Sequence, residues 1–239
     1  MKRALVTGGT KGLGLGIAKM LIEEGYYTII TYSSDHRAAI RCERELSLIT
    51  QDYEIIQADQ NNYDSLRSLV AHVCQSGRID CLVCNAGTTL RKDITSISNE
   101  EWENVMNVNV NSNFYLIRDL YNNFSNQARI VLIGSVLGIY PHASSLAYGV
   151  SKAAVHALAK NLVKSFEGTK ITVNAIAPGF VETEWQKDKP EEIRNNIYSK
   201  TAAERFATID EVVDVVRLCI NNSYLNGSII KVDGGYCYK

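Results

Sequence analysis

The sequence predicts an α/β protein in which one doubly wound parallel sheet carries helices on both faces. Short apolar runs of strand length alternate with stretches of helical spacing along the whole chain. A glycine-rich loop follows the first of these strands, as in folds that bind nucleotides at the sheet's carboxyl edge. The 239 residues, 46% of them hydrophobic, suit a single domain spanning 1–239.

The balance of charge argues against several classes of partner. The chain has 25 basic and 26 acidic residues, and no block of Lys or Arg stands out. Neither nucleic acid nor a membrane is therefore an expected partner, and a small molecule is. A strand-like run begins within the first residues, which leaves no room for a secretion signal, and no apolar run is long enough to span a bilayer. We expect a cytoplasmic protein.

The cysteines and histidines are not arranged as a metal site. The one C-x-x-C pair, Cys81 and Cys84, lies in a strand-like run, where residues an odd number apart face opposite sides of the sheet. Buried free thiols are expected instead of a disulfide or a metal. The histidines show no ligand spacing, so no metal is predicted and no role is assigned to them: His36, His72, His142 and His156.

The amino-terminal segment reads as strand, glycine loop and helix. Residues 3–7 are apolar, glycines crowd residues 8–16, and apolar residues at helical spacing continue to Gly25. Glycines let the backbone turn sharply and approach a pyrophosphate, and the next helix offers unpaired N–H groups and a positive dipole end. The segment is predicted to bind a dinucleotide through these residues: Gly8, Thr10, Lys11, Gly12, Leu13 and Gly14.

The end of the second strand, residues 27–32, indicates which dinucleotide binds. An NAD site usually places an acidic residue there for the ribose 2'-hydroxyl, but Tyr32 and Ser33 occupy that place. Ser33 and Ser34 can donate hydrogen bonds to a phosphate, and Lys11 adds a positive charge, so NADP(H) is preferred over NAD(H). Asp35 is the argument for NAD(H), because its carboxylate could turn back toward a ribose.

Two further strands end in residues suited to the rest of the cofactor. Residues 54–58 form the third strand, and Asp59 follows it, either to meet an adenine amino group or as an ordinary turn residue. Amphipathic helix 63–74 leads to a fourth strand, 79–84. Small residues beyond that strand let a ribose lie close to the backbone. The predicted contacts there are Asn85, Ala86 and Gly87.

A long helical face extends over residues 98–117. Ser98 and Glu101 make a capping box at its start. Asparagines recur at alternate positions around Asn109, although side-chain amides are mediocre helix formers. An amide that turns inward there needs a partner such as water.

The candidate chemistry lies in residues 134–153. An apolar strand ends just before Gly134, which places Ser135 at a strand's carboxyl end. Tyr148 and Lys152 are four residues apart at the start of an Ala-rich helix, so both side chains project from one helix face. A nearby cation favours the phenolate and draws the phenol's pKa from about 10 toward the working range. Tyr148 is a candidate acid or base.

The last third of the chain completes the alternation. Residues 182–200 differ in character, with Trp185, charged clusters and few core residues, and are expected to form a mobile substrate lid. A plain surface helix is the alternative. The other elements expected are helix 151–166, strand 169–177 followed by Pro178 and Gly179, helix 210–219 and strand 228–232.

Taken together, these residues resemble a short-chain dehydrogenase/reductase, a Rossmann-type family, over nearly the full length of the chain. The matching features, in order, are T-G-x-x-x-G-x-G at Thr7 to Gly14, N-A-G at Asn85 to Gly87, Asn109, Ser135 thirteen residues before Tyr148, Tyr148-x-x-x-Lys152, Pro178-Gly179 and Thr183.

The resemblance implies a role for each site residue. Tyr148 would protonate a carbonyl oxygen as hydride arrives, while Ser135 would hydrogen-bond that oxygen. Lys152 would hold the nicotinamide ribose and lower the pKa of Tyr148. Asn109 would support a water that relays protons to Lys152. Three residues would flank the nicotinamide: Pro178, Gly179 and Thr183.

Within the family the chain is most similar to 3-oxoacyl-(acyl-carrier-protein) reductases, through residues 176–183 and the V-D-G-G at 232–235. That similarity implies a homotetramer that reduces a 3-oxoacyl thioester with NADPH in fatty acid biosynthesis. The positions matched to carrier-docking residues hold Asn126 and Thr169, which leaves docking of a carrier protein open. The alternatives are a reductase or dehydrogenase of another small ketone, alcohol or sugar, and a non-catalytic nucleotide-sensing protein.

Overall fold

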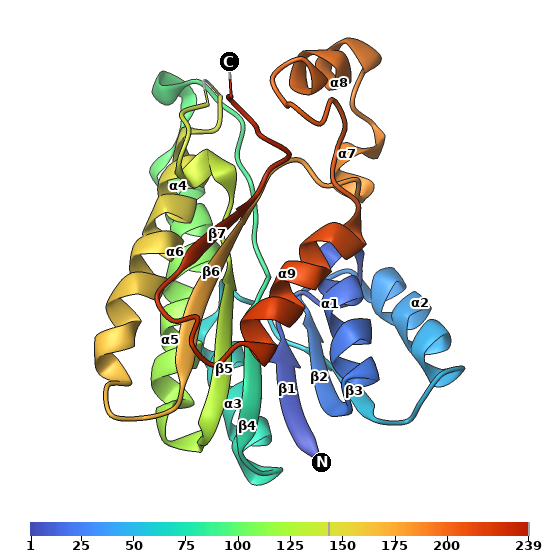
Figure 1. The fold of residues 1–239 in the computed structure, drawn as a ribbon, viewed down its shortest axis with the longest axis vertical. Coiled ribbons are helices and arrows are strands. Elements are labelled where there is room, and N and C mark those ends of the chain that lie inside the picture. Colours follow the sequence, from blue (N-terminus) through green and yellow to red (C-terminus); the bar gives the residue numbers. More distant parts are fainter. Residues whose placement is uncertain (143, 239) are drawn as a thin grey trace.

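The strands of this computed structural model, which describes residues 1–142 and 144–238, lie parallel in one sheet (Figure 1). Within those residues their order is β3-β2-β1-β4-β5-β6-β7. The predicted doubly wound parallel sheet is therefore confirmed. The strands are β1 (Lys2–Val6), β2 (Tyr26–Tyr32), β3 (Tyr53–Gln57), β4 (Ile79–Cys84), β5 (Phe124–Ile133), β6 (Thr172–Pro178) and β7 (Ile229–Val232).

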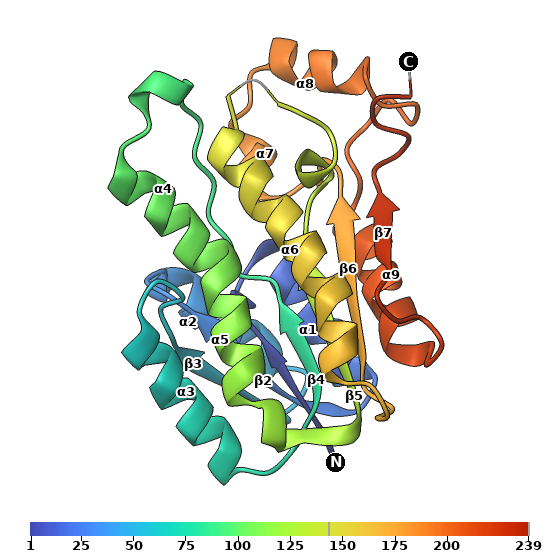
Figure 2. The same ribbon diagram turned by 90° about the vertical axis from the view of Figure 1, so that its left-hand side faces the viewer.

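Helices cover both faces of the sheet (Figures 1 and 2). Buried side chains of α1, α2 and α9 pack in one core, and those of α3, α5 and α6 pack in the other. The helices are α1 (Gly12–Glu23), α2 (His36–Ser47), α3 (Tyr63–Gln75), α4 (Asn99–Met106), α5 (Ser112–Asp119), α6 (Leu146–Ser165), α7 (Glu184–Lys187), α8 (Glu191–Tyr198) and α9 (Ile209–Asn221).

The strand order reverses between β1 and β4, which pair with each other. The chain first winds outward from β1 to β3 and then crosses back to β4 on the other side of β1. The loops after these two strands therefore leave in opposite directions and open a crevice at the carboxyl edge, where such sheets bind ligands. The glycine loop and the Asn85 segment begin at this point.

The cysteine predictions are confirmed in part. Cys81 packs in the core with α1, and Cys84 packs in the core with α3, so their sulfurs diverge as strand alternation requires. All six cysteines are free, but Cys74 and Cys237 are exposed, so burial was wrongly predicted for those two. None of the helices in the described chain has the length and hydropathy needed to cross a membrane.

The helix predicted over 98–117 is interrupted. The capping box of Ser98 and Glu101 starts α4, but a π-helical turn at Asn107–Asn111 separates α4 from α5. Side chains add hydrogen bonds to this turn: Ser112 Oγ donates to Val108 O at 2.7 Å, and Asn113 Nδ2 donates to Asn109 O at 2.8 Å. The inserted residue turns Asn109 fully into the interior, and such turns occur frequently at functional sites.

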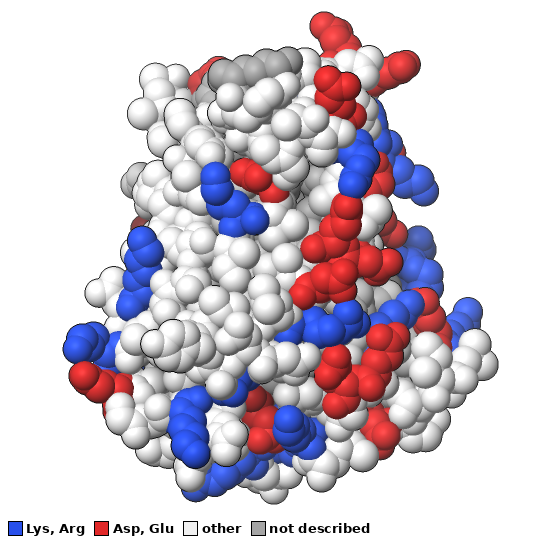
Figure 3. Space-filling model, in the orientation of Figure 1, with Lys and Arg blue, Asp and Glu red and all other residues white. Residues whose placement is uncertain are grey.

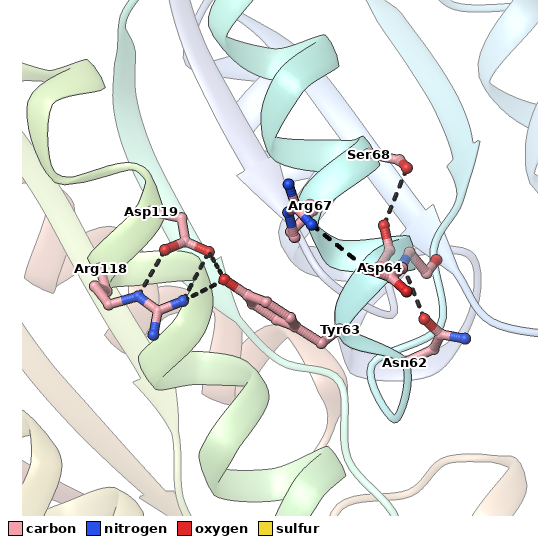
Figure 4. A network of polar contacts seen from close by, with 8 residues as sticks. Asn62, Tyr63, Asp64, Arg67, Ser68, Arg118 and Asp119 are labelled. Atoms are coloured by element: carbon pink, nitrogen blue, oxygen red, sulfur yellow. Dashed lines mark hydrogen bonds and ion pairs between the residues drawn. The ribbon is translucent and has the colours of Figure 1, made fainter.

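The aromatic ring of Tyr63 joins α3 to α5 (Figure 4). Its hydroxyl accepts from Arg118 Nη2 at 2.6 Å and donates to Asp119 Oδ2 at 3.2 Å. Arg118 also lies over the ring of Tyr115, 5.1 Å from its centre. This network holds α5, and with it the π-helical turn, against the helix that follows β3.

The first and last long helices pack through Gly16. A Cβ at Gly16 would collide with Ile209 Cγ2 and lie 3.2 Å from Val213 Cγ2. The absence of a side chain on Gly16 of α1 therefore lets α9 approach closely, and α9 packs over β5, β6 and β7.

We predict that Gly16→Val lowers the free energy of unfolding by about 1–3 kcal/mol, because the inserted side chain overpacks the α1–α9 contact. Ile209→Ala in the same chain should relieve the clash, so the double variant loses less than the sum of the single changes. Urea denaturation of the four proteins measures this. If the losses in unfolding free energy of the two single variants add up to that of the double variant, the contact between Gly16 and Ile209 is contradicted.

Candidate active site

The glycine loop after β1 is tied to the segment after β4. Thr7 Oγ1 accepts the backbone N–H groups of Asn85 and Ala86, each at 3.0 Å. Asn85 Nδ2 returns two hydrogen bonds of 3.0 Å, to the carbonyl oxygens of Thr7 and Gly8. These four contacts fix the two loops across the crevice.

The glycines of the loop are required by its shape. Gly8 and Gly12 have φ of +62° and +54°, a region that side chains disfavour. A Cβ on Gly8 would lie 3.0 Å from Ala86 Cα, and a Cβ on Gly14 would collide with Gly8 O. The backbone is thus closely packed where a pyrophosphate is expected to approach.

The first turn of α1 presents free backbone donors. Lys11 stands at its N-cap, but no side chain caps the helix there. The first N–H groups of a helix have no partner within the helix and attract anions. Gly12, Leu13 and Gly14 contribute this turn, and Thr10 is buried directly before it.

Lys11 and Asp35 form an ion pair of 2.6 Å. Asp35 also accepts the N–H of Ala38 at 3.0 Å and so caps α2. The hydrogen bond from Lys11 is the largest influence that holds the pKa of Asp35 below its usual range. The ionised carboxylate is thus oriented toward α2, and its negative charge is balanced by Lys11. The positive charge of Lys11 is for the same reason only partly available to a ligand.

Ser33 and Asp59 meet where the adenosine is expected. Ser33 Oγ donates to Asp59 Oδ1 at 3.2 Å, and exposed Ser34 lies next in the chain. Asp59 Oδ1 also accepts the N–H of Asn61 at 3.0 Å, so the carboxylate serves as a turn residue. The neighbouring side chain of Gln60 is buried, and both its amide nitrogen and oxygen lack a partner within the described residues.

Ser135, Tyr148 and Lys152 come together at the carboxyl end of β5. Lys152 is buried, donates to Ile133 O at 2.7 Å and lies 5.6 Å from the centre of the Tyr148 ring. Ser135 Oγ accepts the N–H of Leu137 at 3.2 Å. A Cβ on Gly87 would lie 3.5 Å from Lys152 Nζ, so this glycine keeps the ammonium accessible from the cofactor side.

The structure corrects the expected electrostatics of Tyr148. Burial raises the pKa of the phenol, and the influences that oppose it are the hydroxyl of Ser135 and the charge of Arg91, not that of Lys152. Burial also lowers the pKa of Lys152 to about 8, and among the described residues no carboxylate opposes this effect. Tyr148 therefore keeps its proton at neutral pH in the protein alone.

Asn109 braces two parts of the site. Its Oδ1 accepts the N–H of Thr88 at 2.8 Å, and its Nδ2 donates to Thr88 O and to Ser151 Oγ, each at 2.9 Å. Both amide hydrogens are used, so the side chain has none left to give a water. Asn109 thereby links the segment after β4 to α6, one residue before Lys152.

The segment after β6 closes the other side of the crevice. Gly179 N donates to Val232 O at 2.9 Å, and a Cβ on Gly179 would lie 3.0 Å from Asp233 Cα. Pro178 is the last residue of β6. The methyl group of Thr183 lies 3.7 Å from where a Cβ of Gly12 would stand, so this segment borders the glycine loop.

Residues 182–200 form the short helices α7 and α8 beyond the carboxyl edge (Figure 1). Arg194 holds them together: it pairs with Glu182, donates to Gln186 O at 3.1 Å and lies 4.6 Å from the centre of the Phe206 ring. A mobile lid was expected here, with a plain surface helix as the alternative, and the segment contains two short helices.

Comparison with known proteins decides the family. The family model described as "short chain dehydrogenase" matches residues 2–194. The chain belongs to the short-chain dehydrogenase family. It is consequently an NAD(P)-dependent oxidoreductase that acts on CH–OH and C=O groups, and the resemblance found in the sequence is confirmed.

Particular relatives span almost the whole chain. A 3-oxoacyl-[acyl-carrier-protein] reductase, FabG, of Thermotoga maritima is 31% identical, over 98% of this chain and 97% of that protein. The RhlG/NADP active-site complex of Pseudomonas aeruginosa superimposes with a TM-score of 0.90 at 32% identity, covering 99% and 96% of the two chains. A blue fluorescent protein from a metagenomic library, in complex with NADPH, gives 0.92 at 27% identity, covering 98% and 97%.

The residues of this short-chain dehydrogenase fit a dinucleotide. The glycines let the loop pack closely against the Asn85 segment, where a Cβ on Gly8 or Gly14 would meet protein atoms, and the first N–H groups of α1 follow directly after this loop. The orphaned amide of Gln60 lies beside Asp59, at the end expected for the adenine. Sequence reasoning missed Gln60 because a buried amide in a turn leaves no pattern.

Three other contributors to the site were missed. Thr88 and Ser151 hold Asn109, and His156 lies under Ser135. The glycines on either side of Ser135, at 134 and 138, were the available signal for His156, because they clear space for a ring.

Asn126 and Thr169, matched in the sequence to carrier-docking positions near the site, lie elsewhere. Both line one hollow at the amino ends of β5 and β6, whereas Tyr148 lies at the carboxyl end of β5. Within one chain, these two positions therefore do not border the site around Tyr148.

Proposed function

We propose that the protein is an NADPH-dependent reductase that transfers hydride to the carbonyl group of a 3-oxoacyl thioester. The observation that carries the proposal is the convergence of Ser135, Tyr148 and Lys152 beside the glycine loop. The thioester is supported by the relative from Thermotoga maritima, which is named for that substrate.

The site residues divide the work. Bound NADPH supplies the hydride. The glycine loop and the N–H groups of α1 hold its pyrophosphate, and Asn85, Ala86 and Gly87 border its ribose, with Pro178, Gly179 and Thr183 beside the nicotinamide. Tyr148 gives its proton to the carbonyl oxygen, and the raised pKa suits this direction because the phenol is protonated at neutral pH.

Ser135 and Lys152 support Tyr148. Ser135 donates a hydrogen bond to the oxygen as negative charge develops on it. Lys152 binds the nicotinamide ribose with the ammonium hydrogens that Ile133 O leaves free. Asn109 holds the segment at Thr88 against α6, which keeps Lys152 in place beside Tyr148.

The preference for NADPH over NADH is part of the proposal. Asp35 caps α2 and pairs with Lys11, so its carboxylate is neutralised at the place where it would repel a 2'-phosphate. Ser33 and Ser34 stand exposed beside it as donors. Three of the solved relatives found were obtained with NADP or NADPH.

We further propose one domain over 1–239, a lid at 182–200, and a cytoplasmic homotetramer active in fatty acid biosynthesis. Figure 3 shows a wide, mostly uncharged surface across the middle of this face of the molecule. Large apolar side chains are exposed on several elements, as surfaces between subunits require. They include Phe114 on α5, Val150 on α6, Leu218 on α9 and Tyr224.

The test is NADPH oxidation with an acetoacetyl thioester, carried either on coenzyme A or on the acyl carrier protein, with NADH in parallel. We expect turnover with NADPH, and turnover that depends on the carrier protein would also support docking. Absence of turnover with both thioesters, or preference for NADH, would contradict the proposal.

Tyr148→Phe tests the proton donor. The change removes the hydroxyl that gives the proton, so turnover should fall by about 10²-fold or more, while NADPH binding stays nearly constant. Stopped-flow and fluorescence titration measure the two quantities. Tyr53→Phe, at a tyrosine whose hydroxyl donates to Glu43 on α2, is the matched control. Full activity of Tyr148→Phe would contradict the mechanism.

A second candidate, a reductase of small oxo acids, is favoured by the charge of Arg91. Arg91 forms no ion pair within the described chain, and its charge acts on Tyr148, His142 and Lys189. Burial first, then cations including Arg91, lower the pKa of His142 and of Lys189, and no carboxylate opposes them. A carboxylate near the reacting carbonyl would fit this positive field.

Arg91→Gln separates the two candidates. For acetoacetate, we expect KM to rise about tenfold, because a Coulomb partner is lost, while KM for a neutral ketone of the same size stays unchanged. Lys170→Gln, an exposed cation at the opposite end of the sheet, is the control. Equal changes for the charged and neutral substrates would contradict the second candidate.

A further inference from the structure

The backbone N–H of Ser135 lies just beyond the end of β5 and bonds to a side chain. Gly134 N makes the last bond between β5 and the neighbouring strand, to Ile176 O at 2.7 Å. Ser135 is still extended, with φ of −168° and ψ of 152°, but its N–H points to α6. There it meets Nε2 of His156 at 3.4 Å.

Two glycines make room for the imidazole of His156. A Cβ on Gly134 would collide with Nε2 and lie 2.6 Å from Cδ2 of the ring. A Cβ on Gly138 would lie 3.0 Å from Cε1 and 2.7 Å from the backbone N of Ala153. The ring is 5% exposed, so it is enclosed between the loop that carries Ser135 and the helix that carries Lys152.

The surroundings keep this imidazole neutral. Burial is the main cause that lowers the pKa of His156 to about 4, and the charges of Lys152 and Lys160 add to it. Both cations lie on α6 itself, and no other titratable side chain of the described residues acts on the ring. Nε2 is therefore an acceptor at working pH, and the ring proton lies on Nδ1.

We propose that His156 is a positioning residue that holds Ser135 in place for the reaction. Lys152 and His156 stand one helical turn apart and bind the backbone on either side of Gly134, at Ile133 O and Ser135 N. Helix α6, which carries Tyr148, thus also fixes Ser135. The hydroxyl groups of both residues must reach the same carbonyl oxygen of the substrate. The role rests on the proposed function, because it concerns the reaction assigned to Ser135 and Tyr148.

The first test is a pair of substitutions. His156→Leu removes the acceptor at similar volume, and we expect kcat to fall about tenfold, with NADPH affinity and KM unchanged. His156→Gln retains an acceptor oxygen and should recover part of the loss. His72→Leu, at an exposed histidine on α3, is the control.

A third variant keeps the histidine and moves it. Gly134→Ala places a methyl group where the ring lies, so it should reproduce the kcat of His156→Leu in a folded protein. Circular dichroism and NADPH titration establish folding for each variant.

Stability against pH gives a readout that needs no substrate. The unfolded chain protonates His156 near pH 6.5 and the folded chain only near pH 4, so the wild type loses stability as the pH falls through this window. His156→Leu should lack this pH-dependent part of the stability, whereas His72→Leu should retain it.

The outcomes are distinct. Folded His156→Leu and Gly134→Ala proteins with wild-type kcat would overturn the proposal for His156 and leave the proposed function intact. Equal kcat for the Leu and Gln variants would also overturn it. A wild-type protein that turns over no carbonyl compound would overturn the proposed function, and the role of His156 would fall with it.

Discussion

The hydrogen bonds between Thr7 and the Asn85 segment are the interaction on which the site depends. β1 and β4 are neighbours in the sheet, yet their following loops run in opposite directions, so backbone polar groups at this point have no ladder to join. Thr7 Oγ1 and Asn85 Nδ2 satisfy these groups with four contacts of 3.0 Å. The glycine loop can then leave its own N–H groups free for a ligand, because its position is fixed by the hydrogen bonds to the Asn85 segment.

Helix α6 organises the other half of the crevice in a similar way. Lys152 reaches Ile133 O, Ser151 holds Asn109, and Tyr148 stands one turn earlier on the same helix. The π-helical turn between α4 and α5 is the local distortion that brings Asn109 inward to this contact. One helix therefore sets the geometry of the proton donor, of its cationic neighbour and of the segment that borders the ribose.

The sequence predicted the fold and the members of the site wherever a local pattern carries the information. Alternating apolar runs indicated the sheet, glycine spacing indicated the loop, and the four-residue interval indicated that Tyr148 and Lys152 share a face. What it could not provide depends on contacts between distant residues. Burial, not Lys152, dominates the pKa of Tyr148, and the two amide hydrogens of Asn109 are taken by Thr88 and Ser151.

The same limit applies to the helices and to position in the fold. Apolar periodicity in 98–117 does not reveal an inserted residue, because it records which residues are apolar and not which backbone groups bond to each other. Asn126 and Thr169 were matched by their order in the chain, but their place at the amino ends of strands follows only from the register of β5 and β6. His156 has no periodic signal at all.

The most direct test of the account is the binding of NADPH to the crevice between β1 and β4, measured by fluorescence titration of the wild type and of Gly14→Ala. A Cβ at this position collides with Gly8 O and reaches within 2.5 Å of Asn85 Nδ2. The account predicts saturable binding of one NADPH per chain and a loss of affinity of about tenfold or more in a folded Gly14→Ala protein. Equal affinity of the two proteins, or no binding by the wild type, would contradict it.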